Sequence, residues 1–136
     1  MRQIFLDTET TGLDPNQGHR IIEIAAVEMN NRQLTTNHYH TYLNPGRNID
    51  PAAQEVHGIT LELLQDKPIF KDIAVEFLNF IKDSEIIIHN APFDVGFLNM
   101  ELEKISFDKL EIHSVSIFDS LKLAKEIRPG QRNNLD

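Results

Sequence analysis

The stretch that decides the fold is Ile4-Phe5-Leu6-Asp7-Thr8-Glu9-Thr10-Thr11-Gly12, near the amino terminus of a chain of 136 residues. Its apolar beginning, Gln3–Asp7, predicts a buried β-strand that runs into a polar loop. Because side chains alternate along a strand, Asp7 and Glu9 are expected to share one face. Hydroxyls, a glycine and backbone amides surround them, and such groups can hold a phosphate beside a metal ion. The alternative is that both are solvated acids at a strand end.

The rest of the chain predicts an α/β fold with a mixed central sheet, an antiparallel amino-terminal meander and helices on both faces. Further strands are expected at Ile21–Val27, His38–Leu43, Glu85–His89 and Val115–Asp119, with a turn at Asn30-Asn31. Helices are expected over residues 51–56 with Asp50 as cap, 61–64 with Thr60 as cap, 69–82, from Asn90 onward with Pro92 near the start, and 120–128. Residues 133–136 resemble a helix start. We therefore expect a single domain, residues 1–136, that is incomplete at its carboxyl end.

The composition argues against several classes of protein. The chain has 21 acidic and 13 basic residues, a net charge of −8 and no cysteine. Without cysteine there is no disulfide scaffold, thiolate zinc site or cysteine nucleophile. The negative charge disfavours a simple basic nucleic-acid binder, unless metal ions supply the positive charge that phosphates require. No apolar stretch approaches the roughly 20 residues of a membrane span, and the first residues do not form a signal peptide, so a cytoplasmic location is expected.

A third carboxylate follows the fourth expected strand. In His89-Asn90-Ala91-Pro92-Phe93-Asp94, Asp94 falls in the first turn of a helix, where the helix dipole favours the ionised form. With Asp7 and Glu9 it could gather around divalent cations, whose preferred ligands are carboxylate and water oxygens. The alternative is that Asp94 only balances the helix dipole. His89 and Asn90 are expected to close the strand and cap the helix.

Four stretches, taken in order, closely resemble the DEDDh exonucleases: Phe5–Leu13, Ile22–Ile24, Val56–Ile59 and His89–Asp94. The resemblance covers essentially the whole chain. It implies a ribonuclease H-like fold and removal of nucleotides from 3′ ends by two-metal hydrolysis, with two divalent ions, Mg²⁺ or Mn²⁺, as cofactors. The most similar branch of the family proofreads DNA 3′ ends during replication.

The same resemblance implies roles for individual residues. Asp7, Glu9 and Asp94 would be three of the four metal-binding, catalytic acids. Substrate binding would fall to the backbone of Thr10, Thr11, Gly12 and Leu13, with Leu13 beside the terminal base, and to Val56, His57 and Phe93. Other interpretations stay open. Leu13 and Val56 could belong to the core, Phe93 could pack on Phe97 one turn later, and His57 could end a helix before Gly58.

One part of the family pattern is missing from the sequence. The family carries a fourth acid and a histidine general base as His-x-x-x-x-Asp on a later helix, and no such motif follows Asp94. His113 precedes a strand and is unsuitably placed. Asp119 is a candidate replacement ligand, although the family gives that position a supporting role. Loss of a general base alone reduces a rate by roughly 10²–10⁴-fold, so residues 1–136 are expected to show little or no activity.

Three functions remain open from the sequence. They are a proofreading 3′–5′ exodeoxyribonuclease, an exoribonuclease of the same superfamily, and a catalytically incomplete module that binds a polymerase or an accessory subunit. The resemblance implies four partners: a single-stranded or frayed DNA 3′ end, a polymerase catalytic subunit, a sliding clamp and, in some bacteria, a theta-type small subunit. The family contacts the polymerase through a carboxyl-terminal tail and the sliding clamp through a short motif. Both are absent from this sequence, so only the theta-type contact could lie within it.

Overall fold

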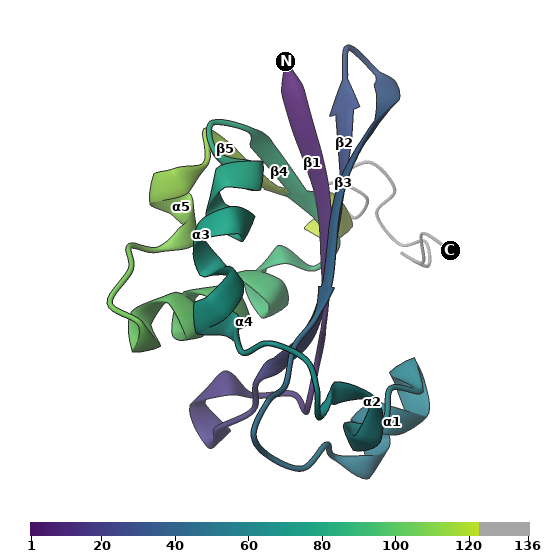
Figure 1. Cartoon of the computed structure of the whole chain (residues 1–136). Helices are drawn as coiled ribbons and strands as arrows, with labels where there is room; N and C mark the ends of the chain where they lie inside the picture. The colour runs from purple at the N-terminus through teal and green to yellow at the C-terminus, as the bar shows by residue number, and fades with distance from the viewer. Residues whose placement is uncertain (123–136) are drawn as a thin grey trace.

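The computed structural model describes residues 1–122, which form one five-stranded sheet with helices packed against it (Figure 1). The strands are β1 (Arg2–Thr10), β2 (Ile21–Asn30), β3 (Gln33–Tyr42), β4 (Glu85–Ile88) and β5 (Ser116–Asp119), in the spatial order β3-β2-β1-β4-β5. The pairs β1–β2 and β2–β3 are antiparallel, whereas β1–β4 and β4–β5 are parallel. The expected mixed sheet with an antiparallel meander is confirmed.

The helices agree largely with the sequence pattern. They are the 3-10 turn η1 (Pro15–Gln17), α1 (Pro51–His57), α2 (Leu61–Leu64), α3 (Phe70–Ile81), α4 (Ala91–Lys104) and α5 (Leu110–His113). Neither η1 nor α5 was expected. From residue 123 onward, the helix expected over 120–128 lies outside the described residues, and so does the helix start at 133–136. Within residues 1–122, no helix is long and apolar enough to cross a membrane.

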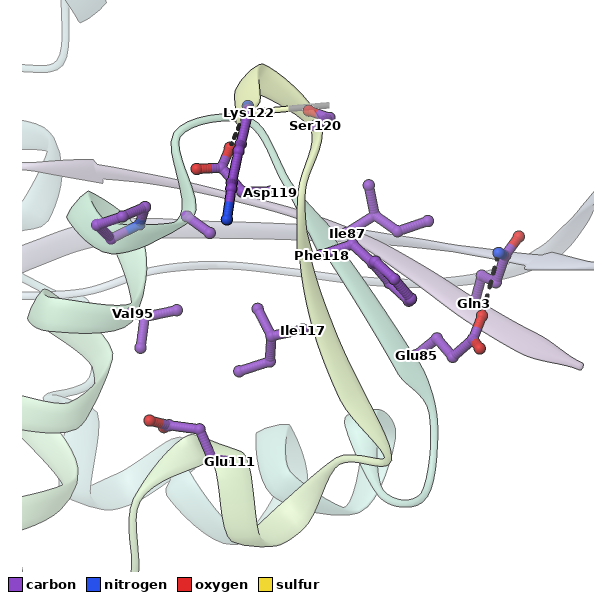
Figure 2. A pocket seen from close by; sticks show the side chains of 12 residues that line it. Gln3, Glu85, Ile87, Val95, Glu111, Ile117, Phe118, Asp119, Ser120 and Lys122 are labelled. Carbon is purple, nitrogen blue, oxygen red and sulfur yellow. Dashed lines mark hydrogen bonds between the residues drawn. The ribbon is translucent and has the colours of Figure 1, made fainter. Parts of the chain in front are cut away.

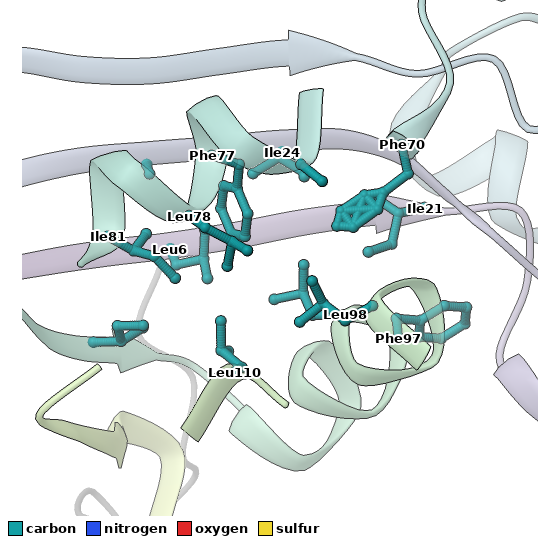
Figure 3. Packing of buried hydrophobic residues seen from close by; sticks show 14 of the residues in the cluster. Leu6, Ile21, Ile24, Phe70, Phe77, Leu78, Ile81, Phe97, Leu98 and Leu110 are labelled. Atoms are coloured by element: carbon teal, nitrogen blue, oxygen red, sulfur yellow. The ribbon is translucent and has the colours of Figure 1, made fainter. Parts of the chain in front are cut away.

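The main core lies on one face of the sheet, between the strands and α3, α4 and α5. Ile4 and Leu6 of β1 belong to it. Figure 3 shows Leu6 together with Phe77 of α3 and Leu98 of α4. Phe70, Ile73, Ala74, Phe77, Leu78 and Ile81 of α3 are all buried. This set confirms the helical period expected over residues 69–82.

Within residues 1–122, helices cover the opposite face of the sheet at one end only. There Ile22 packs with Ile49, Ile59 and Leu64, so that α1 and α2 form a second, smaller cluster. Helices therefore lie on both faces, as expected. Farther along this face Phe5, Val27 and Phe118 are 37%, 43% and 51% exposed. Asp7 and Glu9 point to the same face, because they alternate with the core residues of β1.

Several boundaries differ from the sequence expectation: β2 continues past Val27 to Asn30, and β3 begins at Gln33 rather than at His38. β1 does not end at Asp7 but continues to Thr10, because it pairs with β2 from Arg2↔Asn30 to Thr10↔Ile21. The turn between β2 and β3 is shifted by one residue. Asn31 and Arg32 form it, with φ of 51° and 66°, and a tight hairpin turn requires positive φ at both central residues.

Candidate active site

The three predicted acids come from two elements. Asp7 and Glu9 lie near the carboxyl end of β1, and Asp94 lies in the first turn of α4, where it is 4% exposed. The backbone N–H of Thr8 donates a hydrogen bond to Oδ2 of Asp94 at 3.1 Å. Because Thr8 stands between Asp7 and Glu9, this bond brings the carboxylate of Asp94 to the strand segment that carries the other two.

The three carboxylates oppose one another's ionisation. Burial and then the charge of Asp7 raise the pKa of Asp94 to about 7, against the hydrogen bond from the backbone amide of Thr8. Burial, Asp7 and Glu23 raise the pKa of Glu9. Burial also raises the pKa of Asp7, although the Thr8 amide and His89 act in the opposite direction. None of the ion pairs within residues 1–122 involves these three acids. Their charge is therefore left for a cation to neutralise.

The carboxylate oxygens of the three acids are of the chemical type that binds a divalent metal ion. Carboxylate oxygens are the preferred ligands of Mg²⁺ and related ions. The hydroxyl Oγ1 of Thr8 is buried and has no hydrogen-bond partner in the described part of the chain, but it lies on the core face of β1, opposite the side chains of Asp7 and Glu9. The structure does not gather the three acids into a metal site, because among residues 1–122 no group of three or more His, Asp and Glu side chains is arranged to hold a metal ion.

A cavity of about 300 Å³ opens beside Glu9 and unites most of the predicted nucleotide contacts. Asp7 and Asp94 lie outside its lining, and so does Thr11, which is fully buried. The residues that line the cavity are Thr8, Glu9, Thr10, Gly12, Leu13, Asp50, Ala52, Ala53, Val56, His57 and Phe93.

The sequence prediction missed the contribution of the first turn of α1 to this cavity. Ala52 and Ala53 precede Val56 by four and three residues, so they share its helix face. Helical spacing from Val56 was therefore a signal that could have found them. Asp50, just before α1, had no such signal.

The exposure of the cavity residues separates the alternatives left open by the sequence. Leu13 and Val56 are each 84% exposed, so neither is a core residue. Phe93 both lines the cavity and packs on Phe97, with ring centroids 5.0 Å apart. For Phe93 the two interpretations are therefore compatible.

His57 does more than occupy the last turn of α1. Its Nδ1 accepts the N–H of Ile59 at 3.0 Å, so the ring proton lies on Nε2, which donates to the carbonyl of Thr10 at 3.1 Å. The hydroxyl of Thr10 in turn donates to the carbonyl of Gly12 at 2.6 Å. His57 thus holds the loop that forms the other wall of the cavity.

Asp119 is engaged by backbone amides. Its Oδ1 accepts hydrogen bonds from Asn90, Leu121 and Lys122 at 3.1, 3.0 and 3.3 Å. Burial acts to raise the pKa of Asp119, but these backbone bonds lower it overall. Figure 2 shows this carboxylate in a different cavity, of about 850 Å³, that runs along β5. In this structure Asp119 ties the end of β5 to the start of α4.

The remaining polar residues near the predicted motifs have local roles. Asn90 occupies the N-cap position of α4 as expected, but its φ is 65° and its side chain makes no capping hydrogen bond. His89 lies with Nδ1 3.2 Å from Oγ of Ser120. It acts to lower the pKa of Asp7, which burial raises overall. His113 ends α5, lies with Nε2 3.2 Å from the carbonyl oxygen of Asp108, and lines a separate cavity beside α3.

Comparison with known proteins settles the family. The family model described as Exonuclease (RNase_T) matches residues 4–136. The chain belongs to the exonuclease family. The chain is 55% identical over 140 residues to the DNA polymerase III subunit epsilon of Buchnera aphidicola subsp. Acyrthosiphon pisum (strain APS), covering 99% of this chain and 59% of that protein. It is 52% identical over 137 residues to the protein of that name from Rickettsia prowazekii (strain Madrid E), covering 100% of this chain and 60% of that protein. The chain thus spans about three fifths of the length of these relatives.

Solved structures agree with the family assignment. The chain resembles Exonuclease X in complex with 5′ overhanging duplex DNA, with a TM-score of 0.73 and 25% identity over 97% of this chain and 68% of that chain. It also resembles the nuclease domain of 3′hExo, a DEDDh family member bound to rAMP, with a TM-score of 0.65 and 19% identity over 79% of this chain and 60% of that chain. At 19% identity, the likeness to this second structure concerns the fold alone. The exonuclease family, and the α/β fold expected from the resemblance, are confirmed.

Proposed function

We propose that this exonuclease is the nuclease portion of a proofreading subunit of the DNA polymerase III epsilon type. It removes mispaired nucleotides from DNA 3′ ends in the 3′ to 5′ direction. The observation that carries the proposal is the cavity of about 300 Å³, which joins Glu9 to six of the seven residues expected to contact a terminal nucleotide. Two relatives at 55% and 52% identity that carry the epsilon name support the choice of substrate and process.

The cavity suits one unstacked base. Leu13 on the loop and Val56 on α1 offer apolar surface that water now covers, each with 84% of its area exposed. Burying such side chains against a base is favourable by about 25 cal/mol for each Å² of apolar surface. A 3′-terminal nucleotide that is mispaired is already partly unstacked, so it enters such a cavity at lower cost than a paired one.

The acids next to this cavity would do the chemistry. Asp7, Glu9 and Asp94 would hold two divalent ions, Mg²⁺ or Mn²⁺. When bound, such ions activate the attacking water and neutralise the charge that develops on the leaving 3′ oxygen. The protein contributes the placement of the acids, because the Thr8 amide fixes Asp94, and it holds the nucleotide through the loop and α1. We assign no general base within residues 1–136, and little or no activity is proposed for this length alone.

The implied partners belong to the same proposal. They are a single-stranded or frayed DNA 3′ end, the polymerase catalytic subunit, a sliding clamp and a theta-type small subunit, all in the bacterial cytoplasm at the nucleoid. Contacts with the polymerase and the clamp would lie outside this sequence.

A nuclease assay on the full-length protein tests the proposal. The substrates are 5′-labelled DNA with a paired or a mispaired 3′ end and a matched RNA. In Mg²⁺ the mispaired DNA is expected to shorten fastest, one nucleotide at a time. Asp7→Ala should abolish cleavage, whereas Asp66→Ala, a change at an 83% exposed acid, should leave it intact.

Each other outcome has a defined meaning. Cleavage in excess EDTA, or undiminished cleavage by Asp7→Ala, overturns the metal-dependent mechanism. A strong preference for RNA favours the exoribonuclease alternative. Binding to a polymerase without any cleavage favours the non-catalytic module.

A further inference from the structure

A buried histidine lies behind the loop of the cavity without lining the cavity itself. His19 is 7% exposed. A Cβ built on Gly12 would come within 2.3 Å of Cε1 of His19, so the imidazole ring packs directly against the Gly12 backbone. The loop segment that carries Leu13 therefore rests on this ring.

Hydrogen bonds fix the orientation of the ring. Oγ1 of Thr11 accepts the N–H of Arg20 at 3.0 Å and lies 2.8 Å from Nδ1 of His19. Nε2 of His19 lies 3.4 Å from Oδ2 of Asp50, and a carboxylate oxygen only accepts, so the ring proton is placed on Nε2 and the Thr11 hydroxyl donates to Nδ1.

Asp50 connects this chain of contacts to α1. Its backbone N–H donates to the carbonyl of Thr11 at 2.8 Å, and its carbonyl accepts the N–H of Gln54 at 3.0 Å in the first turn of α1. Its side chain makes no capping bond to α1 and is directed toward His19 instead. His19 thus contacts the loop through Thr11 and Gly12, and the start of α1 through Asp50.

We propose that His19 is a positioning residue that sets the spacing between the two walls of the cavity, the loop of residues 10–13 and α1. It thereby sets the affinity of the cavity for a nucleotide. The identity of the ligand rests on the function proposed above, but the link between the walls does not. Within residues 1–122 the polar partners of His19 are Thr11 and Asp50, so its loss should leave metal binding at the acids unchanged.

Calorimetric titration tests the effect on the ligand. The probe is dTMP with Mn²⁺, and the variants are His19→Ala, His19→Gln and the control His38→Ala, whose ring lies exposed on β3. Each is measured where circular dichroism shows it folded. His19→Ala should weaken dTMP binding by about tenfold, equivalent to about 1.4 kcal/mol, with unchanged affinity for Mn²⁺ alone. His19→Gln keeps a donor toward Asp50 and should recover most of the loss. His38→Ala should match the wild type.

Amide hydrogen exchange without ligand tests the link itself. His19→Ala should lose protection at the N–H of Asp50, which bonds across the two segments to the carbonyl of Thr11, and at the N–H of Thr11, which bonds to the carbonyl of Arg20 next to His19. Thr11→Val, of nearly the same shape, removes the hydroxyl partner of His19 and should give the same loss. Thr11→Val therefore tests the link between the two walls if His19→Ala does not fold.

The two measurements separate the two proposals. A wild-type chain that binds Mn²⁺ but not dTMP contradicts the proposed function, while the exchange data still report on His19. A folded His19→Ala protein with the wild-type affinity for dTMP and unchanged protection overturns the role of His19. A purely stabilising His19 would lower the melting temperature of the variant without changing the affinity of the folded protein.

Discussion

The backbone N–H of Thr8 and Oδ2 of Asp94 lie 3.1 Å apart and join two residues separated by 86 positions in the sequence. The bond fixes the first turn of α4 against β1 at the point where Asp7 and Glu9 project. It holds a carboxylate in a place that burial and a neighbouring acid make unfavourable for charge. The docking of α4 on β1 therefore determines how closely the acids approach.

The raised pKa of Asp94 predicts that the metal-free protein loses stability as the pH rises. The pKa is 3.8 when the residue is unperturbed and about 7 in the folded chain. Below about pH 4 both states are protonated and there is no loss. Between about pH 4 and pH 7 the unfolded chain releases its proton first, so the free energy of unfolding falls by up to about 1.4 kcal/mol for each pH unit. Asp94→Asn keeps an acceptor for the Thr8 amide and should make this fall smaller, leaving the part that the raised pKa values of Asp7 and Glu9 cause. Urea unfolding in EDTA near pH 5 and pH 8 measures it.

The matched control for that experiment is Asp66→Asn, which removes the same charge at an 83% exposed side chain. It should retain the pH dependence of the wild type. If Asp94→Asn retains it too, then Asp94 is not the group responsible.

Metal binding should reverse the loss of stability that the folded protein shows as the pH rises. Mn²⁺ that binds the folded but not the unfolded chain raises the melting temperature by mass action. Near pH 8 the wild type should gain more from Mn²⁺ than Asp94→Asn or Asp7→Asn, because each variant lacks one carboxylate. Equal gains for all three proteins would place the bound metal elsewhere. Differential scanning calorimetry provides the measurement.

Leu13→Ala should weaken nucleotide binding without affecting stability. The side chain is 84% exposed and lines the cavity, so its apolar surface is buried only when a ligand is present. We expect about a tenfold increase in the Kd for dTMP and a change within about 0.5 kcal/mol in the free energy of unfolding. Leu34→Ala, at a 69% exposed position on the β2–β3 hairpin, is the control and should change neither quantity. A similar Kd for both variants would remove Leu13 from the binding surface.

Gly12→Ala should be far more damaging than Gly96→Ala. A Cβ on Gly12 would lie 2.3 Å from the His19 ring, whereas a Cβ on Gly96 meets no atom within 4 Å. Gly96 lies inside α4, where alanine is favoured over glycine by up to about 1 kcal/mol, so that change should be neutral or stabilising. Gly12→Ala should lower the melting temperature and weaken dTMP binding. An equal response of the two variants would show that the loop does not rest on His19.

The ion pair between Arg20 and Glu101 should contribute strongly to stability. Nε and Nη2 of Arg20 donate to the two oxygens of Glu101 at 2.8 and 2.6 Å, and the Glu101 side chain is 3% exposed. Arg20→Met leaves this buried carboxylate without its partner, which typically costs about 3–5 kcal/mol. Lys67→Met breaks an exposed pair with Asp66 and should cost less than about 1 kcal/mol. Chemical unfolding of both variants tests the difference.

Local patterns predicted the elements whose side chains repeat with a clear period. The helical period over residues 69–82 gave α3, and alternation along β1 placed Asp7 and Glu9 on one face. The ends of β1 and β2 were missed because they depend on pairing between the two strands, and polar residues such as Thr8 and Thr10 gave no apolar signal. The single turn α5 is too short to show a period.

The candidate site was predicted in its chemistry but not in its internal contacts. Thr11 was expected in the cavity with its neighbours, yet its backbone N–H donates to the carbonyl of Arg20 and its side chain turns inward to His19. His19 itself stands in a stretch without motif, and its role arises only when the loop and the start of α1 meet. The metal-binding roles of Asp7, Glu9 and Asp94 stay predictions that the experiments above address.

The alternation along β1 also makes the site sensitive to folding errors. Ile4 and Leu6 face the core while Asp7 and Glu9 face outward, so a slip of one residue in the pairing with β2 would reverse all four. A chain in the wrong register would bury the acids and expose the isoleucine and leucine. Such a chain would lose its core and the cavity beside Glu9 together, so the correct strand register is a condition for both.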